Sequence, residues 1–238
     1  MAFTAQDVKA LREKTGVGMM ECKKALVEAD GDMDKAVDFL RERGLAAAAK
    51  KATRIAAEGV VLPYYDAEAK KGVVVEVNSE TDFVAKNEKF MSFVEGVAKT
   101  ILATNPADVE ALKEEKFDGT DRTVTETLND LVLSIGENMK VRRFERMDGI
   151  VSTYIHGGGS VGVMVGFDVA DESKAATAEF DAMGKNVAMQ IAAMSPAYLD
   201  EASVPAEVVE HEKTILAAQM KEDPKMASKP EAVLAKIA

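Results

Sequence analysis

The amino-acid sequence predicts an α+β protein in which three short N-terminal helices precede two related α/β subdomains with antiparallel sheets and a final helical segment. Three observations support this prediction. Apolar residues recur at helical spacing over the first 44 residues, an internal repeat with a constant offset of 90 residues spans 58–196, and helical spacing returns after residue 197. We therefore expect the domain segments 1–56, 57–143, 144–196 and 197–238.

The composition excludes several classes of protein. Of the 238 residues, 47% are hydrophobic, which is enough for more than one core. No apolar run approaches the ~20 residues of a membrane span, and the N-terminus has no signal-peptide pattern, so we expect a cytoplasmic protein without a membrane partner. The single cysteine, Cys22, excludes an internal disulfide framework, and two histidines leave too few ligands for an ordinary zinc site.

The net charge of -11 is unevenly distributed. Residues 1–56 carry 11 basic and 9 acidic residues, whereas the remainder carries 19 and 32. Binding to nucleic acid requires clustered basic residues, so this acidic body predicts no nucleic-acid partner. The charge is compatible with a protein partner and also with solubility alone.

Residues 4–44 have the spacing of three short helices. Thr4, with Asp7 three residues later, fits a capping box at the start of the first helix. Gly44 stands where a glycine would end the third helix. The alanine-rich segment Leu45–Ala57 has high helix propensity and little to bury, so we interpret it as a helical linker.

Met19 and Met20 are adjacent methionines that follow the glycine-containing turn Thr15–Gly18. Two successive residues of a helix cannot both face a small core. Methionine is adaptable and frequent on protein-binding surfaces, so the pair is a candidate contact. The alternative is that one methionine belongs to the core and the other is incidental.

The internal repeat predicts a unit of strand, turn, strand and helix that occurs twice. Its paired positions are glycines, expected at turns, and apolar residues at strand or helix spacing. Examples are Gly72–Val75 with Gly162–Val165, and Phe90 with Phe180.

Further helices are predicted outside the repeat. Residues 123–139 form one between the two copies, and residues 140–144 then lead into the second copy. After the repeat, Pro205 occupies the first turn of another helix, and residues 231–238 form a last helical run.

The turn at residues 76–87 links a predicted buried strand to the helix of the first copy. Ser79 or Thr81 can cap this helix, and Asp82 adds negative charge to its first turn, where the helix dipole favours it.

Phe83 lies at the tip of this turn, where an aromatic residue beside an acid is a good anchor for a protein partner. Its spacing of seven residues from Phe90 would also suit a core position, which is the usual place for phenylalanine. The second copy has Ser173 at the corresponding position, although a shared core would need an apolar residue there. This comparison favours an exposed and specialised Phe83.

No stretch of the sequence forms a catalytic constellation. Residues His156–Gly162 contain an HGGG string and a G-x-S-x-G string, which occur in hydrolases. Strand-like sequence flanks them on both sides, however, so we interpret them as a glycine-rich hairpin turn. A hydrolase is therefore the third function that we consider, after the two that are described below. Neither a P-loop nor a dinucleotide fingerprint is present, so we expect no cofactor, no metal and no enzyme activity.

Two long motifs resemble those of the bacterial elongation factor Ts family, the nucleotide-exchange factors for elongation factor Tu. They are residues 11–26, LREKTGVGMMECKKAL, and residues 76–86, EVNSETDFVAK, and the resemblance continues to Glu210. It implies a UBA-like N-terminal bundle, two related α/β subdomains and a helical hairpin for dimerisation. The function implied is guanine-nucleotide exchange on elongation factor Tu.

The resemblance also implies contact residues for the GTPase. Those in the bundle would meet the nucleotide-binding domain, Asp82 and Phe83 in the turn would enter beside its magnesium and phosphate site, and the histidine would face its third domain. The residues concerned are Arg12, Met19, Met20 and Lys23 in the bundle, Thr81, Asp82, Phe83 and Val84 in the turn, and His156.

One departure from the family pattern concerns the hairpin. The chain ends at Ala238, inside the expected hairpin, so the sequence predicts only a partial hairpin and a weak homodimer or a monomer. The alternative function is a protein-binding adaptor that uses the UBA-like bundle without promoting exchange.

Overall fold

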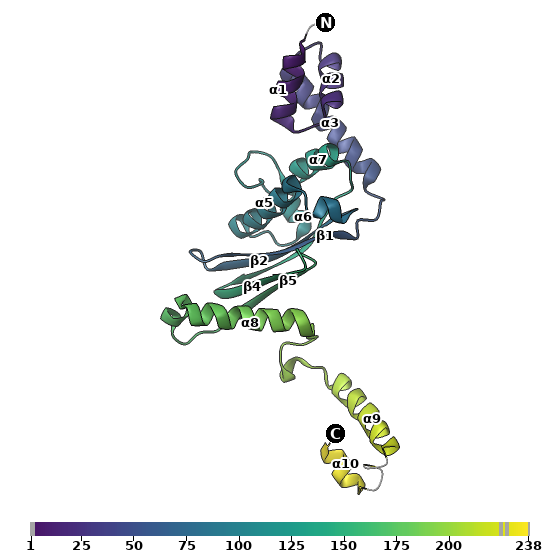
Figure 1. The fold of residues 1–238 in the computed structure, drawn as a ribbon, viewed down its shortest axis with the longest axis vertical. Coiled ribbons are helices and arrows are strands. Elements are labelled where there is room, and N and C mark those ends of the chain that lie inside the picture. Colours follow the sequence, from purple (N-terminus) through teal and green to yellow (C-terminus); the bar gives the residue numbers. More distant parts are fainter. Residues whose placement is uncertain (1–2, 224–225, 227–228, 238) are drawn as a thin grey trace. The chain divides into compact units, whose positions relative to one another are not determined.

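The computed structural model describes residues 3–223, 226 and 229–237, and it confirms the α+β class (Figure 1). The chain divides into two compact units, Met1–Ala193 and Met194–Ala238. The first unit contains both sheets and the N-terminal helices, whereas the described part of the second is helical.

The N-terminal bundle consists of α1 (Ala5–Thr15), α2 (Met19–Glu28) and α3 (Met33–Lys51). The predicted capping box at Thr4 and Asp7 is present. The bundle has its own small core of buried side chains from all three helices and the turns between them: Val8, Leu11, Val17, Cys22, Ala25, Leu26, Ala29, Ala36 and Leu40.

Gly44 does not end the third helix, so this expectation was wrong. The helix α3 continues through Gly44 to Lys51 and includes the first half of the predicted linker. Gly44 faces α7 (Val124–Ile135), where an added Cβ would lie 3.3 Å from the backbone oxygen of Asn129. The missing side chain therefore lets two helices approach closely.

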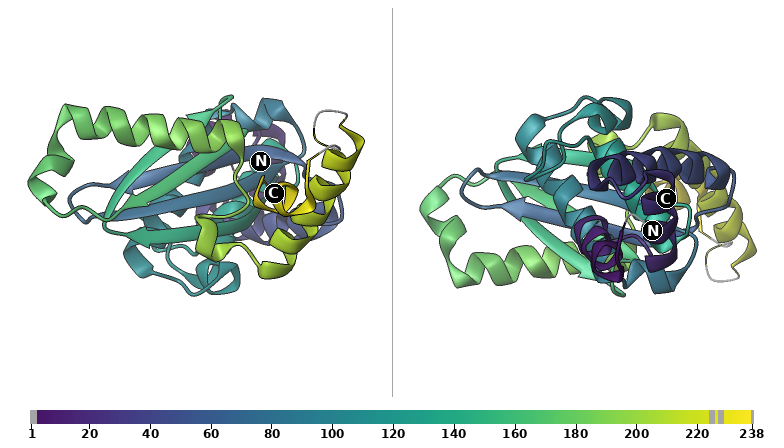
Figure 2. Two further views of the ribbon diagram at one scale, coloured as in Figure 1. Left: turned by 90° about the horizontal axis from the view of Figure 1, so that it is seen from below. Right: turned by 90° about the horizontal axis from the view of Figure 1, so that it is seen from above.

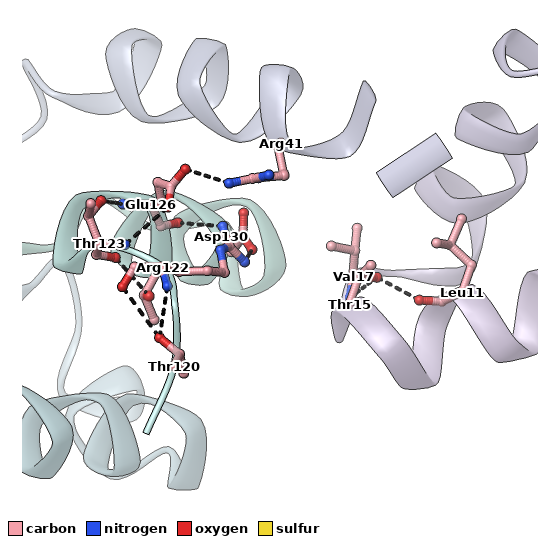
Figure 3. A network of polar contacts seen from close by, with 10 residues as sticks. Leu11, Thr15, Val17, Arg41, Thr120, Arg122, Thr123, Glu126 and Asp130 are labelled. Carbon is pink, nitrogen blue, oxygen red and sulfur yellow. Dashed lines mark hydrogen bonds and ion pairs between the residues drawn. The ribbon is translucent and has the colours of Figure 1, made fainter. Parts of the chain in front are cut away.

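An ion pair reinforces this junction between α3 and α7 (Figure 3). The Arg41 guanidinium of α3 pairs with the Glu126 carboxylate of α7. The second oxygen of Glu126 accepts from the backbone N–H of Thr123 at 3.0 Å, which completes the capping box of α7. Arg122, just before α7, pairs with Asp130 of α7, so this second ion pair stabilises α7 itself. The last helix of the bundle is thus fixed to the helical layer of the sheet domain.

The larger sheet has three antiparallel strands in the order β1 (Glu58–Asp66), β2 (Lys71–Ser79) and β3 (Lys140–Asp148). The second sheet is a hairpin of β4 (Ile150–His156) and β5 (Val161–Phe167). The strand β3 pairs with β2 along its length, so the expected domain boundary between residues 143 and 144 falls inside a strand of the first sheet.

The main core lies between the three-stranded sheet and the helices on one of its faces. These helices are α5 (Glu88–Thr104), α6 (Val109–Glu114) and α7. Alternate residues of β2 and one side of α5 are fully buried in this core: Val73, Val75, Val77, Phe90, Val94, Val97 and Ile101.

The two sheets pack against each other through glycines that lie within strands, and not at turns as the sequence analysis expected. An added Cβ at Gly72 of β2 would lie 2.8 Å from the Met164 sulfur of β5. Its counterpart in the repeat, Gly162 of β5, would place a Cβ 2.8 Å from Cγ1 of Val61 in β1. Each copy of the repeat therefore contributes one glycine to the interface between the sheets.

The other face of the hairpin is covered by α8 (Ala178–Met194), which follows the 3-10 helix η1 (Glu172–Ala176). Figure 1 shows the resulting layers, with α5 to α7 above the larger sheet and α8 below the hairpin, and Figure 2 views the hairpin from the α8 side. Only Gly184 and Ala188 of α8 are buried, so the second copy has a much thinner core.

The second unit contains η2 (Glu201–Ser203), α9 (Ala206–Glu222) and α10 (Glu231–Ile237). Pro205 occupies the N-cap position of α9, one residue earlier than predicted. The predicted last helical run is present except for Ala238, which lies outside the described residues. Within the described parts of both units, we find no helix with the length and apolarity to cross a membrane.

Candidate functional site

The predicted contact residues lie in three places on the first unit. Arg12, Met19, Met20 and Lys23 form an exposed group on α1 and α2, which we call the bundle surface. Residues 81–84 form the turn into the short helix α4 (Asp82–Ala85), which we call the α4 tip. His156 ends β4 at the hairpin turn.

Phe83 is exposed at the α4 tip, as the comparison between the repeats predicted. Its exposed fraction is 81%, whereas Phe90, seven residues later, is completely buried. The chain turns between them, because α4 ends at Ala85 and Asn87 starts α5 with its own side-chain cap. Two separate helices, rather than one continuous helix, therefore allow the two phenylalanines to face in different directions.

The other residues of the α4 tip differ in exposure. Val84 is 7% exposed and belongs to the main core, so it anchors the tip and offers little surface to a partner. Thr81 occupies the N-cap position, but its hydroxyl makes no cap hydrogen bond. Asp82 is exposed beside Phe83.

Glu137, which follows α7, supports the tip, and the sequence analysis did not identify it. One of its carboxylate oxygens accepts from the backbone N–H groups of Glu80 and Thr81, at 3.1 and 3.0 Å. The other accepts from the Thr81 hydroxyl at 2.7 Å. Charge-assisted bonds of this kind are stronger than neutral ones, so Glu137 fixes the two residues that precede Asp82.

A reciprocal contact strengthens this attachment. The Glu80 carboxylate accepts from the backbone N–H of Asn138 at 2.6 Å and from the Arg54 guanidinium at 3.3 Å. The side-chain amide of Asn138 in turn donates to the Arg54 backbone oxygen at 2.8 Å. The two adjacent pairs Glu80–Thr81 and Glu137–Asn138 therefore hold each other by both side chains and backbone.

Asp82 forms an ion pair with Lys86 at 2.8 Å, one helical turn later. The hydrogen bond from Lys86 and its positive charge hold the pKa of the Asp82 carboxyl below its ordinary value. Both side chains are well exposed, so the pair contributes little to stability. Asp82 is thus a solvent-exposed anion beside an exposed aromatic ring.

The bundle surface contains both methionines, so neither belongs to the core. Met19 and Met20 are 40% and 65% exposed. The side of α2 away from Met20 supplies Cys22, Ala25 and Leu26 to the bundle core, and Met19 lies at the edge of that side. Val27, which the sequence analysis missed, is 53% exposed and follows Met20 by seven residues, so it extends the same side of the helix.

His156 ends β4 at the glycine-rich turn, which is a hairpin between two strands as predicted. Its Nδ1 lies 3.0 Å from the Tyr154 hydroxyl. Gly157, Gly158 and Gly159 all have positive φ angles. The backbone oxygen of Gly159 accepts from the N–H of Val61 at 2.8 Å, so the turn is attached to the larger sheet.

The described residues contain no group of three or more histidine, cysteine, aspartate or glutamate side chains that could hold a metal ion. The arrangement is therefore one of exposed side chains on an ordered frame, in which an aromatic ring, two methionines and a histidine are available for contacts with another protein.

Comparison with known proteins gives consistent matches. The family model "Elongation factor TS" matches residues 80–238. An elongation factor Ts from Clostridium perfringens is 54% identical over 91% of this chain and 71% of its own length. One from Syntrophotalea carbinolica is 50% identical over 100% of this chain and 76% of its own length. One from Clostridium novyi is 48% identical, with coverages of 98% and 75%.

Proposed function

This chain belongs to the elongation factor Ts family, and from this premise we propose that it binds the translational GTPase elongation factor Tu and promotes the release of GDP. The proposal needs no catalytic residue. A protein that weakens the binding of GDP must itself be bound more weakly when GDP is present, by the same factor. The contacts of the exchange factor must therefore favour a conformation of the GTPase that binds GDP weakly.

The single observation that carries the proposal is the exposure of Phe83 on a fixed turn. A ring that is 81% exposed loses contact with water only when a partner covers it. Because Glu137 and Asn138 hold the preceding residues, little order has to be gained on binding. We propose that Phe83 and Asp82 enter the GTPase beside its magnesium and phosphate site. Magnesium requires near-ideal octahedral geometry, so a small displacement of its ligands would weaken the nucleotide complex.

The bundle surface and His156 would supply further contacts. Methionine side chains adapt to an apolar pocket, which suits Met19 and Met20 as anchors on the nucleotide-binding domain. Lys23 and Arg12 are exposed and bring positive charge to this otherwise acidic protein. We propose that these contacts provide affinity, whereas the α4 tip provides the effect on the nucleotide.

The proposal predicts that the chain accelerates the release of a fluorescent GDP analogue from elongation factor Tu. The release rate should rise with the concentration of the chain and then saturate. A chain that binds the GTPase without changing the release rate would instead support the adaptor function, which would rest on the exposed methionines of the bundle surface.

Substitution His156→Ala is expected to weaken binding to the GTPase several-fold and to leave the fold intact. The side chain is exposed, and surface substitutions usually change stability by less than about 0.5 kcal/mol. Titration of the GTPase with wild type and variant, together with thermal melts, checks both expectations. His211→Ala, at an exposed position of α9, is the matched control. Unfolding of the His156 variant would indicate a structural histidine instead.

A further inference from the structure

We infer that residues Ser134–Asn138, at the C-terminal end of α7, hold the bundle surface and the α4 tip in a fixed relative position, with Ser134 and Glu137 as positioning residues. The functional consequence rests on the proposed exchange activity, whereas the contacts themselves need no partner. Neither residue has to touch the GTPase, because each holds a backbone segment next to the exposed residues.

Glu137 holds the α4 tip. Both of its carboxylate oxygens accept hydrogen bonds from Glu80 and Thr81, the residues directly before Asp82. Asn138, whose side chain is buried, is bonded to Glu80 and Arg54. The backbone is thus fixed on the N-terminal side of Phe83, and the buried Val84 fixes it on the other side.

Ser134 holds the turn that precedes α2. Its hydroxyl donates to the backbone oxygen of Gly16 at 2.8 Å. The Lys89 ammonium of α5 donates to the same oxygen at 3.1 Å. Gly16 is the left-handed residue that ends α1, and a Cβ at this position would lie 3.0 Å from the Lys89 nitrogen. This turn leads directly to Met19 and Met20.

Ser134 and Glu137 are only three residues apart in the sequence, one in the last turn of α7 and the other just after the helix. Buried side chains of α7, including Leu131 and Val132, fix the helix against the main core. Gly136 then ends α7 in the left-handed conformation, with φ of 92°, and the chain leaves the helix before Glu137. One short, well-packed segment therefore connects the two anchors.

A fixed separation matters when both surfaces contact one GTPase. Once the first surface has bound, the second is already in place, and its effective concentration is high. If either anchor were loose, part of the binding free energy would be used to order the segment. If an anchor is loosened, we therefore expect weaker binding to the GTPase or slower release of GDP, although every residue at the contact is unchanged.

A merely structural role for these residues would lower stability and affect every activity alike. The inference makes a narrower prediction, because each positioning residue should act through one surface. The effect of Glu137→Gln should depend on the presence of Phe83, and the effect of Ser134→Ala on the presence of Met20. Thermal melts of all variants identify any general loss of stability.

The first experiment needs no partner. The chain contains no tryptophan, so Phe83→Trp introduces a single fluorescent reporter at the α4 tip. We expect Glu137→Gln to lower the fluorescence anisotropy of this reporter, because the neutral amide loses the charge that strengthens the hydrogen bonds from Glu80 and Thr81. Ser92→Ala is the control, since Ser92 lies beside Lys89 and Ser134 in the same cavity of about 540 Å³ but its hydroxyl forms no hydrogen bond within the described residues. Unchanged anisotropy in the Glu137 variant would overturn the inference for the tip.

The second experiment measures GDP release in two double-mutant cycles. We expect Glu137→Gln to lower the maximal release rate about tenfold in the wild type and much less in Phe83→Ala. Ser134→Ala should raise the concentration for half-maximal release several-fold, and by less in Met20→Ala. Ser92→Ala should change neither quantity. If the effects of the two substitutions in a cycle are additive, the positioning role of Glu137 or Ser134 in that cycle is contradicted.

The outcomes separate this inference from the proposed function. If Phe83→Ala leaves GDP release unchanged, the proposed role of the tip fails, whereas the anisotropy of the fluorescent reporter in the Phe83→Trp background still decides whether Glu137 orders the tip. If Phe83→Ala lowers release but Glu137→Gln lowers neither release nor anisotropy, the proposed function stands and the positioning role is overturned.

Discussion

Substitution Phe83→Ala is expected to lower nucleotide exchange about thirtyfold or more, which corresponds to a loss of ~2 kcal/mol at an interface hot spot. The ring is 81% exposed, so its removal leaves no cavity in the free protein. The free energy of unfolding should therefore change by less than ~1 kcal/mol. Release rates of GDP from elongation factor Tu and thermal melts of the chain measure the two quantities.

Two further variants control this experiment. Ser173→Ala, at the counterpart of Phe83 in the second copy of the repeat, should change neither stability nor exchange, because Ser173 is exposed and outside the proposed contacts. Asp82→Ala should lower exchange less than Phe83→Ala does. A large fall in melting temperature for Phe83→Ala, with the exchange activity per folded molecule unchanged, would show that the ring has a structural role instead.

The internal repeat made much of the fold predictable, because residues that match between its two copies are mainly those needed for packing in each copy. Both copies contain the predicted strands and long helix, with α5 and α8 at equivalent places. The repeat also served as an internal comparison for the tip. Periodicity alone favoured a buried Phe83, whereas Ser173 in the other copy indicated correctly that the common fold does not require a ring there.

The glycines were less predictable, because the same residue type serves unrelated purposes. Gly16 ends α1 with a positive φ, as local sequence rules expect. Gly44 and Gly72 instead lie inside a helix and a strand, where the backbone or side chains of distant elements leave little room for a Cβ. Local sequence contains no information about the neighbour, which is Asn129 in one case and Met164 in the other.

The support of the α4 tip was not predictable for a similar reason. Glu137 lies 56 residues from Thr81 in the sequence, and nothing in its immediate surroundings distinguishes it from the many other acidic residues. Thr81 itself matched a helix cap by position, but its hydroxyl is used by Glu137. The exposed residues that we propose as contacts could be selected from a motif, whereas the residues that hold them required the tertiary structure.

Substitution Phe90→Ala is expected to have the opposite profile from Phe83→Ala. Phe90 is fully buried between α5 and the larger sheet, among the valines of β2. Truncation removes apolar contacts and leaves a cavity that the surrounding strands and helices can fill only in part, so we expect a loss of ~3–5 kcal/mol in the free energy of unfolding.

For a unit of this size, that loss lowers the melting temperature by roughly 6–20 °C. Calorimetry of the two variants provides a matched comparison, because the same side chain is removed from positions seven residues apart. Exchange per folded molecule should fall less for Phe90→Ala than for Phe83→Ala, since Phe90 has no exposed surface for a partner. Equal melting temperatures for the two variants would contradict the assignment of one ring to the core and the other to the interface.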